Sequence, residues 1–335
     1  MTIARNITIG LSTLLVASLV ACQSTPPAAQ GPAAIELVPP TEAQVEQLEV
    51  AQAASDAGQY DEALVLFQDL LAENPTITPA YMGIGDIHMV RKNYEQAEPA
   101  YARAARLEPN NFDAQYGHGL ALQMLERFVE AVRAYRRALR IDPGSTKANL
   151  NIATTFLQMT EADRAVDYAE RAVALSPDNG AARANLGAIY EELGRSAEAV
   201  DSYIAAIELM GNQPPLMLNL INVLGKENRY REAANTALTL IRIEPTANAY
   251  ERLGWCSFKL REYDDSVDAY RQAVDIDPSH WPSHNGIGVN AINTWLLSKK
   301  RDEAAKVVAG DHFRRSLRIN PEQPRVIQLV LNYQL

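Results

Sequence analysis

A period of 34 residues is the feature that most limits what this chain can fold into. Six alanines follow one another at this spacing: Ala63, Ala97, Ala131, Ala165, Ala199 and Ala233. Twelve residues after each alanine lies a proline or, once, a glycine: Pro75, Pro109, Pro143, Pro177, Gly211 and Pro245. A fixed period of this length indicates a stack of repeated units, each packed against its neighbours, rather than one globular core.

Small and bulky residues also alternate at fixed places in the repeat. One position holds Gly85, Gly119, Ala153, Gly187, Gly254 and Gly288, and another holds Phe67, Tyr101, Tyr135, Tyr203, Tyr270 and Phe313. Helix-forming Ala, Leu, Glu, Arg and Gln are abundant between these positions. This pattern predicts pairs of helices that cross closely at the small residue and enclose the ring, with the proline ending the second helix.

The pattern resembles tetratricopeptide repeats over roughly residues 44–323. The resemblance implies an all-α solenoid, a superhelix of about eight helix–turn–helix repeats with a C-terminal capping helix at 324–335. The units are expected at 44–77, 78–111, 112–145, 146–179, 180–213, 214–246, 247–280 and 281–323. The last unit contains an insertion in the Trp295–Val308 region.

The N-terminus reads as an export signal. Arg5 precedes an apolar stretch of about 14 residues, which is too short for a permanent membrane helix, so residues 1–21 are expected to be a signal peptide. Residues 19–22 resemble a bacterial lipobox, which implies a lipoprotein acylated (palmitate) at Cys22. An ordinary secretory signal with an incidental cysteine is the alternative. Residues 22–43 are rich in Pro, Ala and Gln and are expected to form a flexible linker.

The residue after the lipobox bears on location. Gln23 occupies the position where aspartate would signal inner-membrane retention in enterobacteria. By resemblance, this favours an outer-membrane lipoprotein facing the periplasm, with the outer leaflet of the inner membrane or the cell surface as alternatives.

Composition and motifs argue against several functions. The formal charge of −10 disfavours nucleic acid as a partner. No catalytic or nucleotide-binding motif occurs, so we expect no enzyme activity, no cofactor and no small-molecule substrate. His280 and His284 are four residues apart, but Pro282 lies between them and no HExxH pattern follows, so no metal site is expected. Cys256 has no disulfide partner once Cys22 is lipidated, and it is expected to be a small buried apolar residue.

The first helices of such repeats line a groove in the tetratricopeptide family, and two sets of residues fall there. Asn151, Asn185 and Asn219 occupy the same position in three successive units and would form a ladder of amides able to pair with a peptide backbone. O-GlcNAc transferases use a similar ladder. The alternative is a solvated structural amide, because asparagine is common at this position of the family.

A second candidate set lies further along the same face. Asn222, Arg252, Trp255, Phe258 and Lys259 would combine aromatic and cationic groups typical of binding hot spots. Alternatively, the eighth unit covers the rings of Trp255 and Phe258, which would then be unavailable to a partner. The carboxylate clamp of cytosolic chaperone adaptors is excluded, because the first unit offers Leu48 and Gln52 in place of the required lysine and asparagine.

These features predict a lipid-tethered periplasmic scaffold that binds protein or peptide partners in the cell envelope and reaches the membrane through its lipid anchor. Three alternatives remain open: a pilotin-like lipoprotein of pilus or secretion-system assembly, a non-catalytic subunit that presents substrates to an envelope hydrolase, and an array that self-assembles through its end units.

Overall fold

The computed structural model describes residues 37–335. Residues 38–335 form one compact unit. The predicted signal peptide, the lipidation site Cys22 and the linker up to residue 36 lie outside the described residues.

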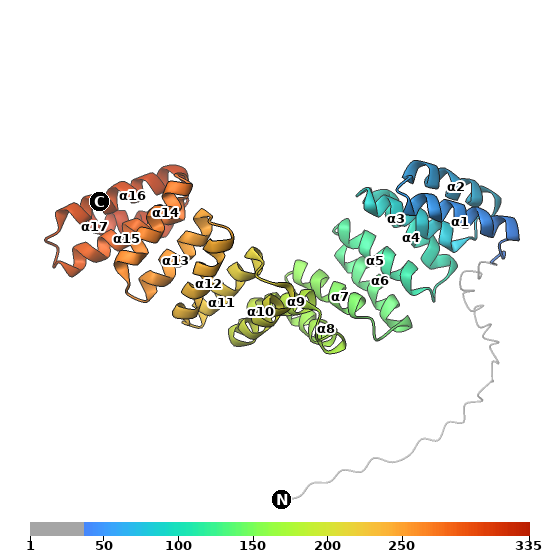
Figure 1. Ribbon diagram of the computed structural model, residues 1–335, viewed down its shortest axis with the longest axis horizontal. Coiled ribbons are helices and arrows are strands. Elements are labelled where there is room, and N and C mark those ends of the chain that lie inside the picture. Colours follow the sequence, from blue (N-terminus) through green and yellow to red (C-terminus); the bar gives the residue numbers. More distant parts are fainter. Residues whose placement is uncertain (1–36) are drawn as a thin grey trace, which may run out of the picture. The chain divides into compact units, whose positions relative to one another are not determined.

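The described residues form seventeen α-helices, and each predicted repeat holds two of them (Figure 1). The pairs are α1 (Glu42–Asp56) and α2 (Tyr60–Glu73), α3 (Thr78–Val90) and α4 (Tyr94–Leu107), α5 (Phe112–Met124) and α6 (Phe128–Ile141), α7 (Thr146–Gln158) and α8 (Ala162–Leu175), α9 (Gly180–Glu192) and α10 (Ser196–Met210), α11 (Pro214–Lys226) and α12 (Tyr230–Ile243), α13 (Ala247–Lys259) and α14 (Tyr263–Ile276), and α15 (Trp281–Leu297) and α16 (Glu303–Ile319). Helix α17 (Pro324–Tyr333) follows the last pair and covers it. The all-α solenoid expected from the repeat period is confirmed.

Local chemistry sets the helix boundaries. Side-chain oxygens of Thr41, Asn111, Ser145 and Asn179 accept a hydrogen bond from the first turn of α1, α5, α7 and α9, which satisfies a backbone amide that would otherwise lack a partner. The short turn between the two helices of a unit needs one residue in the left-handed conformation. Glycine supplies it at Gly58 and Gly194, and the other turns of the first seven units place Lys92, Glu126, Thr160, Asn228 or Arg261 there. The longer turn of the eighth unit has two such residues, Lys299 and Lys300.

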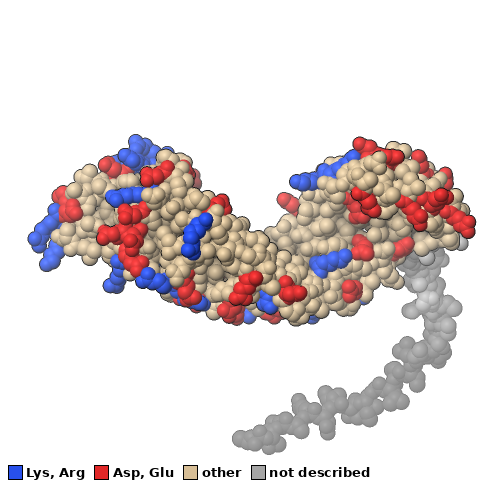
Figure 2. All heavy atoms as spheres, viewed as in Figure 1, with Lys and Arg blue, Asp and Glu red and all other residues tan. Residues whose placement is uncertain are grey.

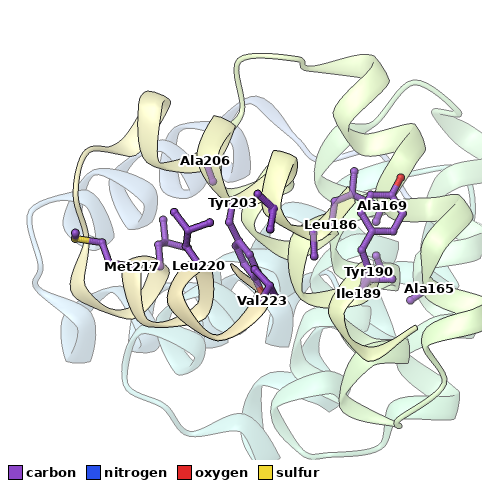
Figure 3. Packing of buried hydrophobic residues seen from close by; sticks show 14 of the residues in the cluster. Ala165, Ala169, Leu186, Ile189, Tyr190, Tyr203, Ala206, Met217, Leu220 and Val223 are labelled. Atoms are coloured by element: carbon purple, nitrogen blue, oxygen red, sulfur yellow. The ribbon is translucent and has the colours of Figure 1, made fainter. Parts of the chain in front are cut away.

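Rings packed on glycines hold neighbouring helices together. Tyr135 is fully buried, and a Cβ added at Gly119 would lie 2.6 Å from its ring. The rings of Tyr101 and Tyr270 each lie between two glycines, one from their own unit and one from the next. Such rings therefore join consecutive units, and the buried core runs without a break from Leu122 to Cys256; Figure 3 shows part of it around Tyr203.

The insertion in the eighth unit lengthens its helices. Helix α15 has 17 residues and α16 has 17, whereas α13 has 13 and α14 has 14. The inserted residues thus extend the helical hairpin beyond the standard repeat, and Lys299, Lys300 and Arg301 lie at its tip between the two helices. Within residues 37–335, no helix combines the length and apolar character needed to cross a bilayer.

Candidate functional site

The side of the array formed by the first helices of successive units, here called the first-helix face, carries the predicted site residues. The amides of the predicted asparagine ladder are half-buried there. Asn151 Nδ2 donates to Tyr116 Oη at 2.8 Å, and Asn185 Nδ2 donates to Thr154 Oγ1 at 2.9 Å. Both acceptors belong to the preceding unit, so these two donors link neighbouring units within the protein.

The third ladder residue, Asn219, opens onto a hollow of 380 Å³ between α7, α9 and α11. Acidic groups dominate this hollow, because Glu191, Glu192 and Asp163 also line it. Tyr203 Oη donates to Glu191 Oε2 at 3.2 Å, and Lys226 Nζ donates to Glu191 Oε1 at 2.8 Å. Burial and the Glu191 carboxylate raise the pKa of Tyr203, which therefore stays protonated.

Three residues of the second candidate set meet at one pocket. Trp255, Phe258 and Lys259 line a pocket of 280 Å³ between α13 and α15, here called the α13–α15 pocket. Trp255 packs edge-on against Tyr230, with ring centroids 5.6 Å apart, and a Cβ added at Gly225 would lie 2.5 Å from its ring. Both Trp255 and Phe258 remain partly exposed, so the eighth unit flanks the rings without sealing them.

The opposite wall of the α13–α15 pocket comes from the eighth unit. Pro282, Asn285, Gly286, Val289 and Asn290 line it, and Tyr270 closes the pocket between the two walls. Asn285 Oδ1 and Asn290 Oδ1 are buried and accept no hydrogen bond within the described part of the chain. A buried amide oxygen without a donor is costly, so these two acceptors lower the stability of this part of the array.

Asn285 and Asn290 were not among the predicted site residues. The sequence does hold a signal for Asn285, which lies at the fifth position of its unit, one of the positions that tend to face the groove. The sequence holds no such signal for Asn290, because its role depends on the hydrogen bonds of its side chain. Its Nδ2 donates to Ser266 Oγ and to the Gly286 carbonyl, and its Oδ1 accepts no hydrogen bond within the described residues.

Two other predicted residues lie outside both hollows. Asn222 is half-buried on α11, and Arg252 Nε lies 3.4 Å from Glu251 Oε2. Burial raises the pKa of Glu251, and the Arg252 guanidinium opposes this in part. Arg252 is therefore occupied in compensating a buried carboxylate of its own helix.

Cys256 belongs to the same helix, α13, and is fully buried, as expected from the sequence. Burial, with a contribution from Glu251, raises the pKa of its thiol to about 12. The thiol is protonated at neutral pH, which makes it a packing group rather than a nucleophile.

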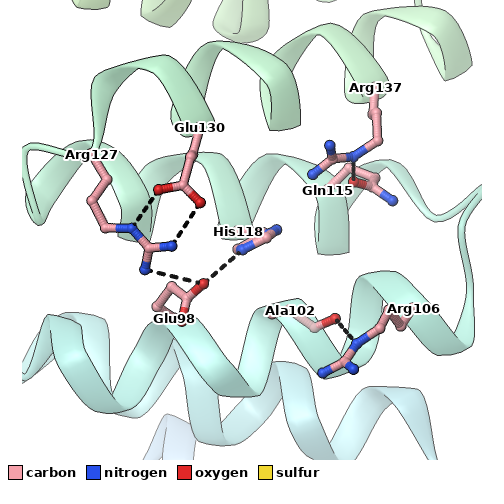
Figure 4. Close-up of polar contacts among 8 residues, drawn as sticks. All are labelled: Glu98, Ala102, Arg106, Gln115, His118, Arg127, Glu130 and Arg137. Carbon is pink, nitrogen blue, oxygen red and sulfur yellow. Dashed lines mark hydrogen bonds and ion pairs between the residues drawn. The ribbon is translucent and has the colours of Figure 1, made fainter.

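Four of the five histidines make polar contacts within the array. His118 lies between α4 and α6, with Nε2 3.0 Å from Glu98 Oε1, in a network that includes the Arg127–Glu130 ion pair (Figure 4). His280 contacts Ser283 and Asn248, and His284 contacts His312. Residues 37–335 contain no group of three or more His, Cys, Asp or Glu side chains arranged to hold a metal ion.

The His284–His312 pair links α15 to α16. His284 Nε2 lies 3.1 Å from the Pro278 carbonyl, which can only accept, so this nitrogen donates. His284 Nδ1 then accepts from His312 Nδ1, 3.0 Å away. Burial is the main cause that lowers the pKa of His312 to about 4, and His284 and Arg315 add to it.

We therefore expect stability to fall as the pH is lowered from about 6.5 towards 4. In this window the unfolded chain binds a proton at residue 312 and the folded protein does not, so acid favours unfolding. His312→Asn retains a donor for His284 but cannot titrate, and it should lose less stability than the wild type between pH 7 and pH 5 in urea unfolding. His88, His118 and His280 have pKa values lowered in the same direction, so part of the dependence should remain. An equal loss in both proteins would contradict the assignment.

Comparison with known proteins agrees with this architecture. A tetratricopeptide repeat family model matches residues 48–98, 82–146, 150–214 and 218–280. The chain therefore belongs to the tetratricopeptide repeat family, whose fold is that of a protein–protein interaction scaffold. No curated protein sequence gives a significant match.

Several solved structures share the fold. A tetratricopeptide repeat protein from Parabacteroides merdae is 14% identical, with a TM-score of 0.54 over 83% of this chain and 100% of that one. PilW, described as a widely conserved type IV pilus biogenesis factor, is 19% identical, with a TM-score of 0.54 over 62% of this chain and 96% of its own. Pseudomonas aeruginosa PilF is 18% identical, with a TM-score of 0.53 over 61% and 93%.

Proposed function

We propose that this protein is a lipid-anchored scaffold of the cell envelope that binds an extended segment of a partner protein on its first-helix face. The α13–α15 pocket carries this proposal. It combines an apolar wall of Trp255 and Phe258, a cation at Lys259, and the polar side chain of Asn285 on the opposite wall. An apolar side chain of the partner can fill such a pocket while polar groups beside it face Lys259 and Asn285.

The membrane part of the proposal rests on the sequence. The lipobox-like residues before Cys22 favour acylation of that cysteine, and Gln23 favours the outer membrane with the array in the periplasm. Residues 23–36, rich in Pro and Ala, would then separate the array from the lipid surface.

Photo-crosslinking in intact cells tests the pocket. A photoreactive amino acid in place of Lys259, which is exposed at the pocket, should capture a partner. Adding Trp255→Ala to the same chain should reduce this capture at least about tenfold, because a buried aromatic anchor contributes a large share of the binding energy. Val129→Ala, which shortens an exposed side chain on α6, is the matched control and should leave capture unchanged.

The identity of the captured protein separates the functions. A cell-wall hydrolase would support the scaffold or the substrate-presenting subunit. A pilus secretin would select the pilotin-like alternative. A cytosolic partner would contradict the envelope location, and capture that survives Trp255→Ala would remove the pocket from the binding site. A melting curve of the Trp255→Ala protein shows whether the array remains folded.

A further inference from the structure

The charges of this array are distributed unevenly along its length. Residues 37–77 hold eight acidic side chains and no lysine or arginine. Residues 281–335 hold eight lysine and arginine side chains against four acidic ones. Figure 2 shows acidic groups gathered over the end formed by α1 and α2, whereas the end that carries α15 to α17 shows basic groups with acidic groups among them.

The acidic end is an exposed helix face. Glu42, Glu46 and Glu49 recur at spacings of four and three residues, so they share one face of α1, and all three are exposed. Val45 and Val50 lie beside this stripe and are 40% and 53% exposed. None of the three carboxylates forms an ion pair with any described residue, so the face combines unpaired negative charge with apolar surface.

The basic end is complementary. Arg314, Arg315 and Arg318 line a hollow of 510 Å³ on α16, with Asp311 and Leu317. Arg314 pairs with Asp311 at 2.7 Å, while Arg315 and Arg318 have no carboxylate partner among residues 37–335.

Apolar surface accompanies these arginines as well. Helix α17 packs beside α16, and the C-terminal Leu335 lies close to Gly310. The outer side of α17 leaves Ile327 40% and Leu331 71% exposed. The last unit and its covering helix thus expose both cations and aliphatic side chains, as the first unit exposes anions and valines.

We propose that the acidic α1 end of one copy binds the basic α16–α17 end of a second copy, so that the protein assembles head to tail. The two ends are different surfaces, and a contact between different surfaces leaves one free end of each kind on every dimer. Further copies can therefore add, and the solenoid continues from chain to chain. Opposite charges would steer this contact, and the exposed aliphatic side chains would be buried in it.

Charge reversal gives a directional test. Glu46→Lys with Glu49→Lys reverses the acidic end, and Glu42 is left in place because it stabilises the N-terminus of α1. Arg315→Glu with Arg318→Glu reverses the basic end. Full-length chains with two different affinity tags are co-expressed in pairs, and the amount of the second chain isolated with the first is measured.

Each reversed chain should fail to bind itself, with at least about a tenfold loss of the co-isolated copy relative to the wild type. The two reversed chains together should still bind, because one retains the basic end and the other the acidic end, and their two reversed ends are again opposite in charge. Asp201→Lys with Glu208→Lys, an exposed acidic pair on α10, is the matched control and should self-associate like the wild type.

Two results would overturn the proposal: self-association that persists in either reversed chain, or failure of the two reversed chains to bind each other. If the basic end serves an anionic membrane instead, Arg315→Glu with Arg318→Glu reduces binding to anionic lipid vesicles while tagged wild-type chains do not co-isolate. Circular dichroism of each variant separates loss of contact from loss of fold.

Discussion

Replacing Tyr135 by alanine is expected to lower the free energy of unfolding by about 3–5 kcal/mol, the usual cost of deleting a buried aromatic ring. Tyr135 is fully buried, and its ring lies on Gly119 of the preceding helix, so no side chain is positioned to fill the cavity. Urea unfolding followed by circular dichroism measures the loss. Because each unit contacts only its neighbours, hydrogen exchange should accelerate most in α5 to α8 and least in α15 and α16.

Tyr135→Phe is the matched variant, since it keeps the ring and removes only the hydroxyl. That hydroxyl donates to Gln123 Oε1 at 2.8 Å and accepts from Asn151 Nδ2 at 3.3 Å. The variant leaves Gln123 Oε1, on a buried side chain, without this donor, which should cost about 1–3 kcal/mol. A loss below about 1 kcal/mol for Tyr135→Ala, or equal acceleration of exchange in all units, would show that the ring does not hold the units together.

The fold could be predicted from the sequence because its period fixes the packing. A glycine such as Gly119 and a ring such as Tyr135 recur at constant separation, and each pair defines one close crossing of two helices. The backbone of a repeat array follows from such local rules, since no contact joins distant units. The position of α17 could be predicted in the same way, because the apolar Val326 is buried when this helix packs against the last unit.

The site was less predictable, because it depends on which hydrogen bonds the side chains make. The ladder position of Asn151 and Asn185 was evident, but their donors are bound to Tyr116 and Thr154, more than thirty residues earlier. Nothing in the period encodes those partners. Likewise, the place of Asn290 in the pocket wall depends on its hydrogen bonds to Ser266 Oγ and to the Gly286 carbonyl. The insertion gave no sign that it would lengthen two helices instead of forming a loop.

Replacing Gly286 by alanine is expected to destabilise the protein by about 1–3 kcal/mol and to distort the α13–α15 pocket. A Cβ at this position would collide with three atoms of the Tyr270 ring. The ring cannot move away freely, because its other side lies on Gly254, where an added Cβ would be 3.0 Å from it. Overpacking of this kind forces side chains out of their preferred rotamers or moves the backbone. Tyr270 lines the pocket, so photo-crosslinking from Lys259 should fall with the stability.

A double-mutant cycle identifies the cause of this loss. In a Tyr270→Leu background the ring is absent, and Gly286→Ala should then cost much less than in the wild type, because the two residues are in direct contact. Gly144→Ala is the control, because the atom nearest to its added Cβ is Asp142 Oδ1 at 3.4 Å and its backbone is not in the left-handed region. The free energy of unfolding should therefore change by no more than about 0.5 kcal/mol. Urea unfolding of the four proteins of the cycle gives the coupling free energy. If Gly286→Ala costs the same free energy of unfolding with leucine at position 270, the collision with the Tyr270 ring is not the source of the destabilisation.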